Sequence, residues 1–247
     1  MNEVLIAYRL LKNNSGSQVM IDVGAHFGGS LVRFAEDGWK VHAFEPSDKN
    51  RLTLEQRTKH QNNVIIETRA LSDRSKDNVS FFESAVSAGI SGLSAFHPGH
   101  VETQRISTIT LRDYCAENNV TAIEFLKVDT EGFDLMVLKG TPWDDIAPRL
   151  IVCEFEDNKT VPLGYTYHDM ALFLKAKGYR VMVSEWYPII EYGAAHDWRC
   201  FNEYPTELAG GSLAWGNLIA TRDESDFQKL KRLLWMINLR AKIRRIH

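Results

Sequence analysis

Apolar strand-like runs alternate with helix-like stretches along this sequence, and that alternation limits the fold more than any other feature. Most of these runs are rich in Val, Ile and Leu, which is typical of parallel strands covered on both faces. The predicted strands are 18–24, 40–46, 63–71, 123–132, 149–156, 179–186 and 211–222. The predicted helices are 28–37, 47–60 with Ser47 as its N-cap, 133–140 and 167–177. This order predicts an α/β fold with a Rossmann-like, doubly wound and mostly parallel sheet.

The length of 247 residues fits a single domain, residues 1–247. Within it we expect a helical extension at 1–17, a core at 18–221 and a basic amphipathic helix at 223–247. Residues 77–108 interrupt the alternation with two strand-like pieces around a Gly- and Ser-rich stretch. They predict a hairpin or lid over one rim of the sheet.

The turn after the first strand has the composition of a cofactor loop, with the sequence MIDVGAHFGGS at 20–30. A dinucleotide fingerprint, G-x-G-x-x-G, needs a bare second glycine against which the pyrophosphate packs. His26 occupies that position. The alternative pattern D-x-G-x-x-x-G, at Asp22, Gly24 and Gly28, suits a nucleoside ligand without phosphates.

Carboxylates follow four of the first five predicted strands. In a doubly wound sheet, ligands bind at the carboxyl ends of the strands. Glu45, after the second strand, has the place of an acid that accepts hydrogen bonds from ribose hydroxyls, although a solvated acid at a turn fits equally well. The other carboxylates at or just after the ends of predicted strands are those of Asp22, Asp129, Glu131, Glu154 and Glu156.

These stretches together resemble the FkbM family of S-adenosylmethionine-dependent methyltransferases, in order from Val19 to Glu156. The most specific part is the block K-x-D-x-E-G-x-D-x-x-x-L-K-G at Lys127–Gly140. Three residues depart from the family pattern: His26, Thr130 and Asp134. The resemblance implies a class I methyltransferase fold and S-adenosyl-L-methionine as the cofactor.

The resemblance also implies roles for individual residues. The turn Gly24, Ala25, His26 and Gly28 would pack against the amino-acid and ribose parts of the cofactor. Asp22 would hold its ammonium, Glu45 its ribose hydroxyls, and Ala70 and Leu71 would flank the adenine. The ring of His26 is expected to face solvent, with only its backbone used.

Methyl transfer to an alcohol needs a base for the hydroxyl proton. Asp129 is the first candidate for this catalytic role, ahead of Glu131, Glu154 and His26. Glu131 has the alternative role of favouring the start of the following helix, and Asp134 is expected at the surface. We predict no metal, with Mg²⁺ on Asp129 and Glu154 as the alternative.

The acceptor is expected to be a small molecule or glycan, because the family mostly methylates hydroxyls of sugars and natural products. Rim segments 84–108 and 186–212 would contact it. Aromatic residues in the second rim would stack on the acceptor or simply pack the lid: Trp186, Tyr187, Tyr192, Trp198, Phe201 and Tyr204. Two other hypotheses are a nicotinamide-dependent Rossmann oxidoreductase and a catalytically inactive, ligand-binding relative.

Charge and cysteine content bear on partners and compartment. Residues 229–247 hold seven Lys and Arg and no acid, within a chain of net charge −3, so the rest is acidic and no nucleic-acid partner is expected. Three scattered cysteines favour a reducing compartment, and the N-terminal apolar run is broken by Arg9, unlike a signal peptide. We therefore expect a cytoplasmic protein.

The tail itself carries an apolar stripe at helical spacing: Leu230, Leu233, Leu234, Ile237 and Ala241. Docking of this helix on the domain or on a second subunit of a homodimer is the preferred interpretation. Peripheral membrane contact is the alternative.

Overall fold

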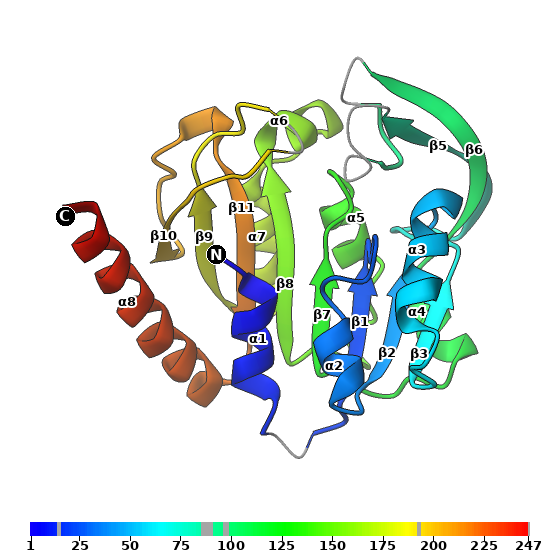
Figure 1. Ribbon diagram of the computed structural model, residues 1–247, viewed down its shortest axis with the longest axis horizontal. Helices are drawn as coiled ribbons and strands as arrows, with labels where there is room; N and C mark the ends of the chain where they lie inside the picture. Colours follow the sequence, from blue (N-terminus) through cyan, green and yellow to red (C-terminus); the bar gives the residue numbers. More distant parts are fainter. Residues whose placement is uncertain (14–15, 85–90, 96–98, 192–193, 247) are drawn as a thin grey trace. The chain divides into compact units, whose positions relative to one another are not determined.

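The structure is a computed structural model that describes residues 1–13, 16–84, 91–95, 99–191 and 194–246 (Figure 1). The chain divides into two compact units. The middle unit comprises residues 15–148 and 191–194, and the terminal unit comprises 1–14, 149–190 and 195–247. The prediction of one domain over residues 1–247 stays a prediction.

The middle unit contains four parallel strands in the order β7-β1-β2-β3 (Figure 1). They are β1 (Val19–Val23), β2 (Lys40–Phe44), β3 (Val64–Glu67) and β7 (Phe125–Val128). All of β7, and all but the first residue of β1 and of β2, is buried, as expected for strands covered on both faces. The α/β, parallel-sheet prediction is confirmed here.

Helices α2 (Val32–Glu36), α3 (Asp48–Thr58), α4 (Leu111–Glu117) and α5 (Asp134–Lys139) belong to the same unit. Ser47 is the N-cap of α3, as predicted, because its side chain accepts from the Asn50 N–H. The first helix is shorter than predicted, since residues 28–31 form turns before α2.

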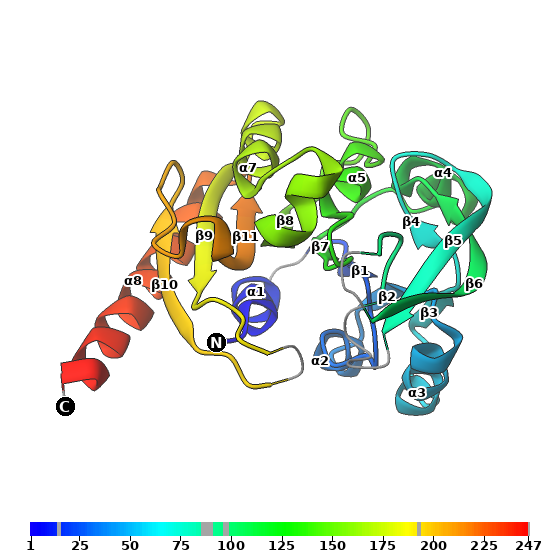
Figure 2. The same cartoon turned by 90° about the horizontal axis from the view of Figure 1, so that it is seen from above.

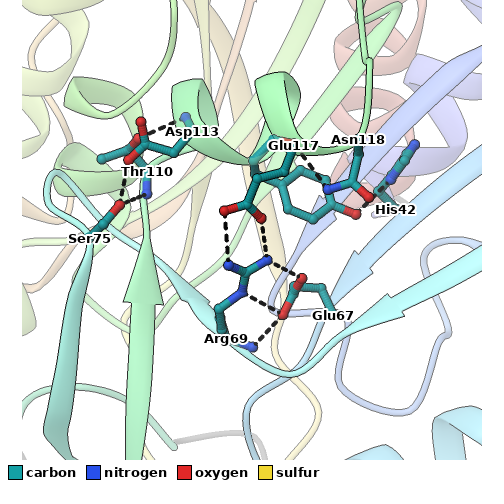
Figure 3. A network of polar contacts seen from close by, with 9 residues as sticks. His42, Glu67, Arg69, Ser75, Thr110, Asp113, Glu117 and Asn118 are labelled. Atoms are coloured by element: carbon teal, nitrogen blue, oxygen red, sulfur yellow. Dashed lines mark hydrogen bonds and ion pairs between the residues drawn. The ribbon is translucent and has the colours of Figure 1, made fainter.

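The predicted third strand, 63–71, is wrong as one element. It breaks after Glu67, and β4 (Ala70–Leu71) pairs instead with β6 (His100–Ile109). Arg69 fixes the break: its guanidinium lies 2.8 Å from Glu67 Oε2 and 2.8 Å from Glu117 Oε2, at the end of α4 (Figure 3). These two ion pairs hold Arg69, the residue just before β4, against the end of α4.

Residues 77–108 form the predicted pair of strands. β5 (Lys76–Ser84) runs antiparallel to β6, and with β4 they make a separate three-stranded sheet in the order β4-β6-β5. Residues 85–90 and 96–98 of the predicted loop lie outside the described residues.

The terminal unit contains four strands: β8 (Leu150–Glu156), β9 (Arg180–Trp186), β10 (Trp198–Glu203) and β11 (Trp215–Thr221). β11 is antiparallel to both β8 and β9, and β10 is antiparallel to β9. β10 is absent from the sequence-based prediction. A 3-10 turn, η2 (Gly211–Leu213), replaces the start of the predicted strand 211–222.

Three further short elements of this unit follow β8: α6 (Asp157–Thr160), η1 (Val161–Leu163) and α7 (Tyr167–Ala176). A capping box between Thr166 and Asp169 starts α7. Figure 2 shows α7 on one face of β8, β11 and β9 and α1 (Glu3–Leu11) on the other.

Both terminal helices are packed parts of the terminal unit. Glu3 is buried at the start of α1, where its carboxylate accepts from the Ser184 hydroxyl at 2.5 Å and the Trp186 indole at 2.8 Å. On α8 (Glu224–Ile246), Leu230 and Leu234 are fully buried, as is Phe227. The docked interpretation of the C-terminal helix is therefore confirmed for these residues.

Asn238 of α8 closes the outer edge of β10. Its side-chain oxygen accepts from the Phe201 N–H at 2.9 Å, and its amide donates to the Phe201 carbonyl at 2.8 Å. A free strand edge offers such groups to any passing strand, and α8 occupies them here.

Candidate active site

The turn after β1 requires glycine at its first position. Gly24 has a φ of +73°, and a Cβ there would lie 1.9 Å from the Asp129 carbonyl oxygen. The N–H groups of Gly24 and Ala25 both donate to the Phe44 carbonyl, at 3.0 Å each. The turn is thus held against the ends of β2 and β7.

Glu45 follows β2 and binds the same turn. Its Oε2 accepts from the His26 N–H at 2.7 Å and its Oε1 from the Ser47 N–H at 3.0 Å. Burial raises the pKa of this carboxyl, although both N–H donors act in the opposite direction. Glu45 therefore joins the turn to the start of α3.

Lys127 of β7 links two of the predicted acids. Its Nζ lies 3.3 Å from Asp22 Oδ1, 3.3 Å from Asp129 Oδ2 and 2.7 Å from the Gly24 carbonyl oxygen. Burial opposes its charge, but the carboxylates of Asp129 and Asp22 outweigh burial and raise the pKa of Lys127. This lysine stays charged between two carboxylates.

Asp22 is fully buried, and its other oxygen accepts from the Ser30 hydroxyl. An ammonium contact, as predicted, would have to share this carboxylate with Ser30 and Lys127. The observed contacts give Asp22 a role in holding the turn, and its predicted cofactor contact stays a prediction.

His26 differs from the expectation that its ring faces solvent. The ring stacks on Phe27 at a centroid distance of 3.7 Å, and within the described residues its buried Nε2 has no hydrogen-bond partner. Burial lowers the pKa of His26, with the Asp129 carboxylate acting in the opposite direction. The His26 N–H binds Glu45, and the predicted packing of its backbone against the cofactor stays a prediction.

The residues after β7 form a tight turn. Glu131 has a φ of +57°, and Thr130 donates to Asp134 through its N–H at 3.4 Å and its hydroxyl at 3.0 Å. Asp134 was expected at the surface, and this is wrong: it is 2% exposed, because it closes this turn at the start of α5. Phe133 is the N-cap of α5 and makes no side-chain cap hydrogen bond; both roles predicted for Glu131 stay predictions.

Ala70 and Leu71 are buried in β4, opposite Thr108 and Ile109 of β6. They belong to the three-stranded sheet and not to the end of the third parallel strand. Their predicted contact with adenine stays a prediction.

Glu154 lies in β8 of the terminal unit, where sequence reasoning overlooked its neighbour Lys159. The Lys159 side chain is 3% exposed, and its Nζ lies 3.5 Å from Glu154 Oε2 and 2.7 Å from Glu156 Oε2. The middle unit brings together Asp22, Gly24, His26, Glu45 and Asp129. Within the terminal unit, Glu154 pairs with Lys159, and its predicted catalytic role stays a prediction.

The aromatic residues of segment 186–212 mostly pack within the terminal unit. Phe201 and Tyr204 are buried, and the rings of Trp198 and Phe201 lie 4.8 Å apart. Tyr187 is 39% exposed with the Arg199 guanidinium over its ring. Tyr192 lies outside the described residues.

Comparison with known proteins gives a family match. Residues 22–181 match the family described as Methyltransferase FkbM domain. Among curated proteins, none matches the chain in sequence.

Several solved structures resemble the chain at low identity. A methyltransferase FkbM from Methylobacillus flagellatus KT is 15% identical over 85% of this chain and 45% of that chain, with a TM-score of 0.48. A precorrin-6y C5,15-methyltransferase from Geobacter metallireducens GS-15 is 11% identical over 88% and 86%, with a TM-score of 0.46. An O-methyltransferase from Bacillus cereus, solved in complex with SAH, is 10% identical over 88% and 79%, with a TM-score of 0.45.

Proposed function

The chain belongs to the FkbM methyltransferase family and is an S-adenosylmethionine-dependent methyltransferase; on that premise we propose that it methylates a hydroxyl group of a sugar, glycan or glycosylated natural product. One observation carries the proposal. Lys127 Nζ lies 2.7 Å from the carbonyl oxygen of Gly24 and 3.3 Å from Asp129, so the glycine turn and a carboxylate base share one ion-pair network. An alcohol acceptor needs such a base.

The residues of the turn fit a cofactor that carries positive charge and no phosphate. Asp22, Lys127 and Asp129 together sum to one negative charge, which favours a cationic ligand over a pyrophosphate. Glu45 accepts a backbone hydrogen bond at each oxygen and one more from the Asn50 side chain. A carboxylate has about four acceptor sites, so about one remains for a ribose hydroxyl. When bound, S-adenosylmethionine supplies the activated methyl group.

Asp129 is the proposed general base. Its side chain is 39% exposed, whereas Asp22 is fully buried, so an acceptor hydroxyl can reach only the first of these two carboxylates. The proton would move from the hydroxyl to a carboxylate oxygen of Asp129. Lys127, which keeps its own proton, orients that carboxylate.

Asp129→Asn tests the assignment, because it keeps the size of the side chain and removes the charge that accepts the proton. We expect kcat for release of S-adenosylhomocysteine, measured with a panel of sugars and glycosides, to fall by at least about tenfold. The affinity for S-adenosylhomocysteine in calorimetry should change much less. Asp145→Asn, at an exposed surface ion pair with Arg112, is the matched control and should behave as wild type.

Preserved kcat in Asp129→Asn would overturn the assignment and move Glu131, Glu154 or His26 forward. In the same assay, EDTA should leave activity intact, and a loss restored by Mg²⁺ would contradict the metal-free prediction. A protein that binds S-adenosylhomocysteine but turns over no acceptor would instead support an inactive ligand-binding relative.

A further inference from the structure

The C-terminal half of α8 carries a second apolar stripe on the side opposite its contacts with the terminal unit. Phe227, Leu230 and Leu234 point into the terminal unit and are fully buried. On the other side of the helix, Trp235 is 64% exposed, Met236 46% and Leu239 44%. These three side chains form an outer stripe that is separate from the docking face.

The orientation of the outer stripe is fixed by the contacts of the inner face. Asn238 binds both backbone groups of Phe201, and it lies between Met236 and Leu239 in the chain. The helix cannot rotate to bury Trp235 without breaking this pair of hydrogen bonds. The exposure of the stripe is therefore a property of the docked helix.

The charge around the stripe selects one kind of partner. Residues 229–247 contain seven Lys and Arg and no acid, and Arg232 is exposed one turn before Trp235 and Met236. Lys229 and Lys231 are each at least half exposed, although they also pair with Asp226 and Glu203. An apolar stripe with a bordering tryptophan among cations is the composition of a helix that lies in an anionic membrane interface.

We propose that the outer stripe of α8, Trp235, Met236 and Leu239, rests on an anionic lipid surface while the helix stays docked on the terminal unit. A nucleic acid would use the cations and could stack a base on Trp235, but Met236 and Leu239 offer it no aromatic face, whereas a lipid interface can bury all three side chains. Contact with the surface is peripheral: among the residues that the structure describes, no helix is long and apolar enough to cross a membrane.

Co-sedimentation of the full-length chain with lipid vesicles tests this. At low salt we expect binding to phosphatidylglycerol-containing vesicles and little binding to pure phosphatidylcholine, with release as about 0.5 M NaCl screens the charges. The triple variant Trp235→Ser, Met236→Ser, Leu239→Ser keeps every cation, and its partitioning should fall at least about tenfold. Leu172→Ser, at another exposed leucine of the terminal unit (48% exposed), is the control and should bind as wild type.

Three outcomes would overturn the proposal. The first is full-length protein that stays in the supernatant with anionic vesicles at low salt. The second is a triple variant that sediments as well as wild type, because vesicle binding would then depend on the cations alone and not on the outer stripe. The third is a vesicle-free dimer in analytical ultracentrifugation that the triple variant abolishes, because a second copy would then cover the stripe.

Discussion

Lys127→Met is the most informative single change, because it removes the cation that two carboxylates share. The Asp22 side chain has no contact with solvent. In Lys127→Met its carboxylate would stay buried and charged opposite a thioether. Removing one partner of a buried pair costs about 3–5 kcal/mol. Asp129, with 39% of its side chain exposed, can be solvated and adds little. A loss of this size is a large part of a typical unfolding free energy of about 5–15 kcal/mol.

The assay is urea unfolding at pH 7 followed by far-UV circular dichroism, with the midpoint and the slope compared between variants. The double variant Asp22→Asn, Lys127→Met has no buried charge left at this position, so it should be more stable than Lys127→Met alone. Lys231→Met is the control: its ion pair with Glu203 is exposed, and its loss should cost no more than about 1 kcal/mol.

A loss of less than about 1 kcal/mol in Lys127→Met, the range of a surface ion pair, would show that Asp22 does not need this lysine. A double variant whose loss equals the sum of the losses of Asp22→Asn and Lys127→Met would show that the two side chains are not coupled.

Three further predictions concern the same unit. Glu45→Ala should weaken binding of S-adenosylhomocysteine by about 1–3 kcal/mol in calorimetry, because charge-assisted hydrogen bonds are lost; an unchanged affinity in a folded variant would move the cofactor elsewhere. Gly24→Ala should abolish cofactor binding, and Gly38→Ala should not. Both glycines have a positive φ, but only at Gly24 would the new Cβ meet a backbone oxygen, at 1.9 Å. Burial lowers the pKa of His42 from 6.5 to about 4, so the unfolded chain binds more protons in that range and stability should decline as the pH falls from 6.5 to 4. The melting temperature of His42→Gln should depend less on pH over this range than that of wild type or of the exposed-site control His60→Gln, and equal slopes would rule out His42 as the cause.

Sequence patterns predicted the parallel part of the fold because burial on both faces leaves a clear signature. β1, β2 and β7 were each found as apolar runs, and Ser47 was found from capping chemistry. The break between β3 and β4 was missed; Arg69, which lies in it, binds Glu117, and a partner 48 residues further along the chain leaves no local sequence pattern. β10 was missed because its residues are largely half-exposed and its pairing with β9 is non-local.

The candidate site was predicted in outline, and its central cation was not recognised. Asp22, Gly24, Glu45 and Asp129 follow from their positions at strand ends. Lys127 stood in the most specific block of the sequence, yet a lysine inside an apolar strand gives no sign of which carboxylates it will meet. The ring of His26 was misjudged because stacking on Phe27 leaves no sequence pattern.

The contact between Asn238 and β10 can form only late in synthesis, because α8 is the last helix to be made. Asn238 lies 37 residues after Phe201, so during synthesis the strand is complete well before its cover exists. In that interval the open edge can pair with a strand of another nascent chain, which is the route to aggregates linked by shared sheets. Slow translation of α8, or substitution of Asn238, would lengthen the exposure, and the yield of monomer should then fall as expression rises.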